Sequence, residues 1–170
     1  MLFPEIPYGN LKKRMSYFAK SGSIKKLSRG IYAKDQFNVL ELANKLYTPS
    51  YISLETVLQK AGATFQYYES IFAVSYISRT VEVGGHTIVY RRMKKSALLN
   101  KKGIEEQENV VIASPERAFL DAVYLYKDYH FDNLSSLNWD KVTELKDLYG
   151  SRKFLKRVEE YYQAYKENRA

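Results

Sequence analysis

The chain has 170 residues, of which 45% are hydrophobic and 27% charged, a composition typical of folded domains and not of disordered chains. It has no cysteine, which excludes disulfides, thiolate metal sites and cysteine nucleophiles. No apolar run approaches the roughly 18 residues of a transmembrane helix, and the residues before Asn10 lack the order of a signal peptide, so we expect a cytoplasmic protein without a membrane partner.

Positive charge is concentrated at the N-terminal end of the sequence. The chain has 27 Lys and Arg against 19 Asp and Glu, a net charge of +8, and residues 1–34 hold eight of the basic side chains and a single acid, Glu5. The other 136 residues therefore carry a net charge of only +1. This asymmetry predicts a basic module over residues 1–34 and a separate body over residues 35–170.

The basic module opens with a predicted helix. Asn10 is a typical N-cap, and Gly22 is the type of residue that ends a helix. Four residues at helical spacing between them predict an apolar face: Leu11, Met15, Phe18 and Ala19. Nine residues precede Asn10, too few for the two helices that come first in a full winged helix. We therefore expect this face to pack on the second domain or on another subunit of a homodimer.

A predicted hairpin follows the helix. Two short strand-like stretches, "SIKKLS" and "IYAK", are joined at Arg29 and Gly30, and a glycine there can adopt the positive φ of a tight hairpin turn. The order of helix, break and basic hairpin is typical of the recognition helix and wing of a winged-helix module. We therefore expect a small partial winged helix in front of the body.

A recognition helix presents polar and basic groups to base edges, while the wing's Lys and Arg meet phosphates. The residues predicted to contact DNA are Lys12, Lys13, Arg14, Ser16, Tyr17, Lys20, Lys25, Lys26 and Arg29. Three other interpretations stay open: a solvated basic surface, docking on an acidic protein partner, and RNA binding. An anionic membrane surface is less favoured, because the apolar face lacks a stripe of Trp and Leu.

The body alternates helical and strand patterns, which predicts a mixed α+β domain. We expect helices over residues 39–46 and 53–61, the second capped by Ser53 and ended by Gly62, with a break at residues 48–50. An antiparallel hairpin is expected over residues 70–93 around Gly84 and Gly85. A polar loop over residues 100–109 and a buried strand, "VVIA", complete this part.

Three helices are expected in the last third of the chain. In "SPERAFLDAVYLY", Ser114 is the predicted N-cap, Pro115 occupies the first helical position, and Arg117 and Asp121 are spaced i, i+4. Two polar-faced helices follow. The apolar side of the last one is predicted to hold Phe154, Leu155, Val158, Tyr161, Tyr162 and Tyr165.

No catalytic constellation is apparent in the sequence. His86 and His130, the only histidines, have uninformative neighbours, and the phosphate-binding and zinc-binding motifs are absent. We therefore expect no enzymatic activity, no catalytic residues, no cofactor and no metal. Most of the sixteen tyrosines stand at helical or strand spacing and are expected to pack in or around the core, with Tyr17 and Tyr32 of the basic module as exceptions.

Three stretches together resemble the AbiEi-type antitoxins of type IV toxin–antitoxin (abortive infection) systems. "GSIKKLSRGIYAK" resembles the family's wing pattern, "G-x-I-x-R-L-x-R-G-x-Y". "YTPSYISLETVLQKAG" is similar to its "P-x-Y-I-S-x-E-S-A-L" helix, and "VVIASPERAFLDAVYL" to its "A-x-P-E-R-A-L-L-D-A" helix. The matches fall in the family's order and span about residues 11 to 125.

The resemblance implies an antitoxin that also regulates its own transcription. Lys13, Ser16, Tyr17 and Lys20 would then face the DNA groove, with Lys25, Lys26 and Arg29 on the wing. It further implies that the C-terminal domain neutralises a nucleotidyltransferase-like toxin without forming a stable complex with it. The helix that carries Pro115, Glu116, Arg117 and Asp121 would be structural.

Overall fold

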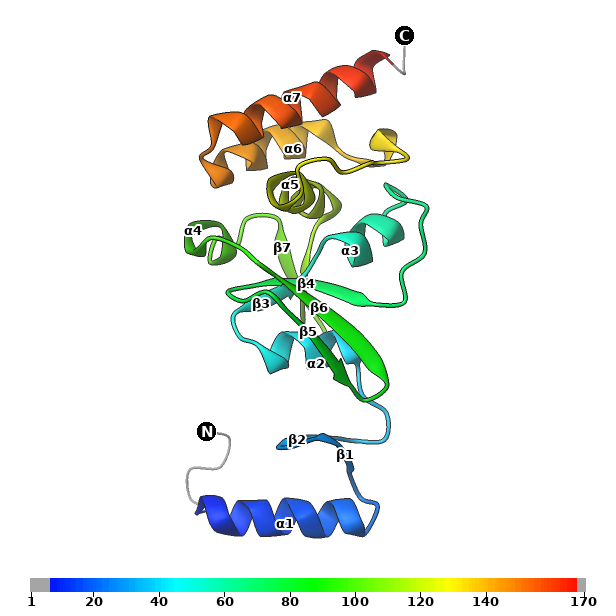
Figure 1. Ribbon diagram of the computed structural model, residues 1–170, viewed down its shortest axis with the longest axis vertical. Coiled ribbons are helices and arrows are strands. Elements are labelled where there is room, and N and C mark those ends of the chain that lie inside the picture. Colours follow the sequence, from blue (N-terminus) through cyan, green and yellow to red (C-terminus); the bar gives the residue numbers. More distant parts are fainter. Residues whose placement is uncertain (1–6, 168–170) are drawn as a thin grey trace. The chain divides into compact units, whose positions relative to one another are not determined.

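The computed structural model describes residues 7–167 (Figure 1). Residues 1–6 lie outside the described part of the chain. They include Glu5 and most of the N-terminal stretch in which we expected no signal peptide. The chain divides into two compact units, which are described separately. Unit 1 extends to Asn38 and includes Val83–Gly85, and unit 2 comprises Val39–Glu82 and the residues from His86 onward. None of the described helices is long and apolar enough to cross a membrane.

In unit 1, helix α1 runs from Tyr8 to Lys20 and starts earlier than predicted. Its N-cap is Pro7, whose carbonyl accepts hydrogen bonds from the backbone N–H groups of Asn10 and Leu11. Asn10 therefore lies in the first turn, and its prediction as the N-cap was wrong. The C-terminus agrees with the sequence, because Gly22 has a φ of +78° and the N–H of Ser23 reaches the carbonyl of Phe18, as in a Schellman motif.

The predicted hairpin is confirmed. Strands β1 (Lys25–Ser28) and β2 (Ile31–Ala33) pair antiparallel, and Gly30 in the connecting turn has a φ of +81°. The described residues of unit 1 thus contain one helix and one two-stranded sheet. A winged helix for this unit stays a prediction.

Unit 2 is built on a mixed sheet of six strands in the order β5-β6-β4-β3-β8-β7. The strands are β3 (Ser50–Ile52), β4 (Ile71–Ser75), β5 (Arg79–Val83), β6 (His86–Arg92), β7 (Ile104–Gln107) and β8 (Val110–Ala113). Strand β3 pairs antiparallel with β4, and β7 with β8. Strand β4 lies parallel to β6, and β3 parallel to β8. The predicted α+β class is confirmed.

The sheet differs from the prediction in three places. The expected two-armed hairpin over residues 70–93 is only partly right, since its first arm consists of two strands and β4 runs parallel to β6. The expected break at residues 48–50 contains the start of β3, whose partners β4 and β8 come later in the chain. Strand β7 lies where the sequence predicted a polar loop. As an edge strand it can keep its glutamates exposed, so its sequence is as polar as that of a loop.

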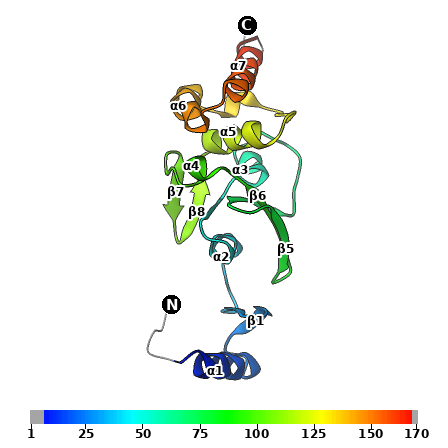
Figure 2. The ribbon, with the colours of Figure 1, turned by 60° about the vertical axis from the view of Figure 1, so that its left-hand side comes forward.

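The helices of unit 2 are α2 (Val39–Leu46), α3 (Glu55–Lys60), α4 (Lys95–Leu98), α5 (Pro115–Leu125), α6 (Trp139–Leu145) and α7 (Arg152–Glu167). Helix α2 packs on β3, β4 and β8, and α5 packs on α3, α6 and α7. Figures 1 and 2 show α5, α6 and α7 across the sheet from α2. Phe154 and Val158 of α7 are buried, and the other residues predicted for its apolar side are half-buried.

Two predicted helix caps had different outcomes. Ser114 caps α5, since its hydroxyl accepts a hydrogen bond from the Arg117 N–H at 3.2 Å and Pro115 follows it. Ser53 does not cap α3, which begins at Glu55. Its hydroxyl instead donates to Asp121 Oδ2 at 2.8 Å. A long-range hydrogen bond to a buried carboxylate thus takes the place of the predicted local one.

Candidate nucleic-acid interface

All nine residues predicted to contact DNA are exposed. Lys12, Lys13, Arg14, Ser16, Tyr17 and Lys20 lie on α1, Lys25 and Lys26 lie on β1, and Arg29 lies in the turn that follows. The structure therefore places the whole predicted set within unit 1, on two adjoining elements.

Helix α1 has one partly covered face and one open face. Leu11, Met15 and Ala19, spaced i, i+4, i+8, are half-buried and form a single row. On the opposite side of the helix, Lys13, Tyr17 and Lys20 are exposed, because helical geometry of 3.6 residues per turn separates them from that row. The polar face expected from the sequence is thus open to solvent.

The apolar face of α1 is less covered than the sequence suggested. The helix has no buried residue, and Phe18, predicted to belong to this face, remains 38% exposed. Its ring contacts that of Tyr17 edge to face, with 5.8 Å between the ring centroids. Burial of α1 therefore contributes little to the stability of the described chain.

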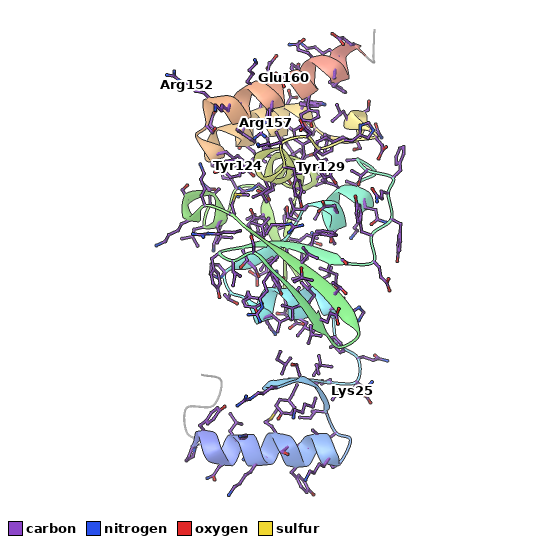
Figure 3. The ribbon with its side chains drawn as sticks, viewed as in Figure 1. Lys25, Tyr124, Tyr129, Arg152, Arg157 and Glu160 are labelled. Carbon is purple, nitrogen blue, oxygen red and sulfur yellow. The ribbon has the colours of Figure 1, made fainter. Side chains whose placement is uncertain are left out.

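The two lysines of strand β1 have different neighbours. Lys25, labelled in Figure 3, lies 3.1 Å from Asp35 Oδ1 through its ammonium nitrogen. Lys26 stands opposite Tyr32 on β2, which is half-buried. Asp35 is the only acid among residues 7–38, which contain eight basic side chains. These charges can be counted in the sequence, but the ion pair between Lys25 and Asp35 is visible only in the structure.

The two body motifs that carry the family resemblance meet inside unit 2 and not at its surface. Arg117, Asp121, Tyr51 and Ser53 are all buried. The guanidinium of Arg117 lies 3.4 Å from Asp121 Oδ1, and it donates to the Tyr51 hydroxyl at 3.2 Å and to the Ala97 carbonyl at 2.7 Å. Asp121 also accepts hydrogen bonds from the hydroxyls of Ser53, Tyr51 and Tyr149.

This network is closed and saturated. A buried ion pair of this kind is stable only when further hydrogen bonds satisfy both partners, and here tyrosine, serine and backbone groups do so. Burial together with the Asp121 charge raises the pKa of Tyr149, and the same causes raise the pKa of Tyr51. Both phenols therefore stay protonated as donors. The network holds α5 against β3 and offers no accessible reactive group.

His130 is exposed and lies 3.6 Å from Asp132. Among residues 7–167, no group of three His, Asp or Glu side chains could hold a metal ion.

A comparison of the chain with models of known protein families finds no match. No curated protein matches it either. The resemblance to the AbiEi-type antitoxins stays a prediction from the three sequence stretches.

Proposed function

We propose that this protein binds duplex DNA through α1 and the β1–β2 hairpin and regulates its own transcription. The observation that carries the proposal is the exposure of all nine predicted contact residues, seven of them basic, on one helix and one hairpin of unit 1. Lys and Arg side chains at this density bind phosphates by displacing condensed counterions. A helix with an open polar face can also read base edges in the major groove.

In this proposal the two elements have different roles. The face of α1 that holds Lys13, Ser16, Tyr17 and Lys20 enters the groove and supplies sequence preference. The hairpin, through Lys26 and Arg29, holds the phosphate backbone and supplies affinity for any sequence.

The role of unit 2 in the proposal comes from the resemblance. It would neutralise a nucleotidyltransferase-like toxin without forming a stable complex with it. A reading frame for such an enzyme beside this gene would support the antitoxin role, and its absence would leave a promoter-binding regulator of another kind.

The test is a titration of the full chain against a fluorescent duplex of its own promoter, at salt concentrations from about 50 to 300 mM. Neutralising four to six phosphates should give a log-log slope of about −4 to −5 for affinity against salt, because each contact contributes about −0.9. No detectable binding at low salt would eliminate the DNA proposal.

Two competing functions can be distinguished in the same assay. If the basic surface docks on an acidic protein partner, polyglutamate should compete as effectively as DNA at equal charge. If the protein reads RNA, single-stranded or hairpin RNA should bind more tightly than the promoter duplex. We expect the promoter duplex to bind most tightly of the three.

A further inference from the structure

Unit 2 has its own concentration of positive charge, which the DNA-binding proposal does not use. Two stretches, residues 94–103 and 145–153, together hold seven basic side chains and one acid, Asp147, a net charge of +6. Unit 2 as a whole has 19 basic and 17 acidic side chains, a net charge of +2, so the rest of the unit is negative. Because protein surfaces usually intersperse both signs of charge, this concentration indicates a surface with a specific role.

The fold brings the two stretches together. Helix α4 packs against the 3₁₀ helix η2 (Lys146–Tyr149), which also packs on α7. The Lys94 ammonium group donates a hydrogen bond to the Tyr149 carbonyl. A Cβ atom on Gly103 would lie 2.9 Å from Leu145 Cδ1, so the turn after α4 also lies against the second stretch. The surface that results, here called the unit 2 basic patch, consists of Lys95, Lys101, Lys102, Lys146, Arg152 and Lys153.

The charges of the unit 2 basic patch are not neutralised by the described part of the chain. Five of the six side chains are exposed, and Lys146 is half-buried. None of the ion pairs within residues 7–167 includes any of the six. Like charges that are grouped without counter-charges repel one another. A partner with negative charge would relieve this repulsion.

The start of α7 adds to the unbalanced charge. Arg152, labelled in Figure 3, and Lys153 are the first two residues of this helix, and its first turn has no acid. A helix N-terminus has a partial positive charge and ordinarily favours acidic side chains. The Ser151 hydroxyl accepts a hydrogen bond from the Phe154 N–H at 3.4 Å, whereas the first N–H groups of a helix have no acceptor within it. A carboxylate from outside the chain can accept hydrogen bonds from them.

The same patch includes an exposed apolar residue. Leu99, which follows α4 and lies between the two lysine pairs of the first stretch, is 53% exposed. The exposed large aromatic side chains of residues 7–167 lie elsewhere, so the patch lacks the stacking platform of single-stranded nucleic-acid sites. A protein interface combines an apolar centre with a polar rim, whereas the phosphate backbone of a duplex offers little apolar surface to cover Leu99. The observations therefore favour a protein partner.

We propose that the unit 2 basic patch docks an acidic segment of a protein partner, in which an apolar residue flanked by carboxylates covers Leu99. The carboxylates pair with the exposed lysines and with the N–H groups at the start of α7. Complementary charge speeds the encounter, and the affinity falls as salt increases. The interaction is independent of the DNA proposal, because all of its residues belong to unit 2.

The probe for the test is the peptide acetyl-Glu-Asp-Glu-Leu-Glu-Asp-Glu-amide, titrated into the ¹⁵N-labelled full chain at low salt and followed by NMR. A matched peptide of equal charge carries serine in place of leucine. We expect saturable backbone shifts in residues 94–103 and 145–153, with the serine peptide binding about fivefold more weakly. Shifts in unit 1 should be equal for the two peptides, because charge alone would cause them.

Substitutions of this chain separate the parts of the site. Leu99→Ser should reduce the affinity for the leucine peptide to that for the serine peptide. Lys95→Gln and Lys153→Gln should each weaken binding of the leucine peptide about two- to threefold. The matched control is Lys127→Gln, which makes the same change in charge at an exposed position after α5. It should leave peptide binding unchanged.

Failure of this inference and failure of the DNA proposal can be distinguished, because Leu99→Ser should leave promoter affinity unchanged. Equal binding of the two peptides, shifts confined to residues 7–38, or unchanged peptide binding by the Leu99 and Lys153 variants would overturn the inference. Random duplex DNA that shifts the patch residues at lower concentration than the leucine peptide does would also overturn it and would assign the patch to nucleic acid.

Discussion

Lys25 and Lys26 are consecutive residues on β1, yet their surroundings differ. Lys25 pairs with Asp35, whereas among the described residues no ion pair involves Lys26. Both partners of the Lys25 pair are well exposed, so the pair itself stabilises the fold by little. In the proposed DNA complex, a phosphate would compete with the Asp35 carboxylate for the Lys25 ammonium group.

We therefore expect Asp35→Asn to strengthen promoter binding by about two- to threefold at low salt, through release of Lys25 and removal of a nearby negative charge. Lys25→Ala should in turn weaken binding less than Lys26→Ala does. The measurement is the promoter titration described above. Glu144→Gln is the charge-matched control, and an equal gain from that variant would show that net charge alone matters.

The Glu55 side chain, unlike Lys25 and Lys26, is buried. Burial raises the pKa of its carboxyl above the ordinary 4.5, an effect that the Tyr126 hydroxyl and the Arg91 charge only partly offset. As pH rises from 4.5 to this higher pKa, the unfolded chain releases the proton while the folded chain keeps it. The folded state therefore binds more protons in this window, and its stability falls as pH increases through it.

Glu55→Gln should remove this loss, because an amide cannot ionise. The Tm of the variant should exceed that of the natural chain at pH 7, and the difference should shrink as pH falls toward 4. Thermal unfolding followed by circular dichroism at several pH values measures both effects. A constant Tm difference across this range would mean that Glu55 ionisation does not affect stability.

Single residues were predictable from the sequence only where their partners are local. Ser114 and Pro115 act within one helical turn, and both predictions are confirmed. Arg117 and Asp121 also meet as their i, i+4 spacing indicated. Ser53 has the same capping chemistry as Ser114, but its partner, Asp121, lies far along the chain. Nothing in its local sequence indicates that contact.

The same distinction holds for whole elements. The β1–β2 hairpin and the end of α1 were predictable, because glycines with positive φ define them locally. Strand β3 is short, and its place in the sheet depends on pairing with β4 and β8. Strand β7 shows exposed glutamates where a buried strand would show apolar residues. Both strands escaped prediction because tertiary pairing, and not hydrophobic periodicity, determines them.

The helix and hairpin of unit 1 should respond differently to substitution. Lys26→Ala on β1 should weaken binding to the promoter and to random duplex DNA in the same proportion and reduce the salt slope by about 0.9. Ser16→Ala or Tyr17→Ala on α1 should reduce the preference for the promoter over random DNA by about fivefold. Parallel titrations with both duplexes provide the measurement.

Tyr8 is a useful control for that experiment, since it is an exposed aromatic residue of α1 outside the predicted contact set. Tyr8→Ala should change neither affinity. If the Ser16 and Tyr17 variants lose affinity for both duplexes in proportion, α1 contacts only the phosphate backbone and does not read bases.

At the scale of the whole molecule, charge and core are segregated. Residues 7–38 carry a net +7, while the saturated polar network and the tightly packed helix α5 lie in unit 2. The basic surface was predictable from the sequence because charge is counted along the chain. The contact between the segments that follow α3 and α5 was not, since these segments are distant in sequence and neither carries a recognisable motif.

This segregation leads to a prediction about a fragment of residues 35–170. Because no residue of α1, β1 or β2 is buried, their removal exposes little apolar surface, and the fragment should fold alone with a Tm within about 4 °C of the full chain. It should lose promoter binding, since all nine proposed contacts are removed. If unit 2 carries the proposed antitoxin activity, the fragment should still restore growth to cells that express the toxin.

The folding of the 35–170 fragment must be measured before its activity, because an unfolded fragment would fail to restore growth for a trivial reason. Circular dichroism and thermal unfolding of the fragment come first, because only a folded fragment tests the division of functions. A folded fragment that fails to restore growth, where the full chain succeeds, would move the antitoxin activity to the basic unit. A folded fragment that still binds the promoter with the salt slope of the full chain would instead contradict the proposed DNA interface, because +7 of the charge would then be dispensable.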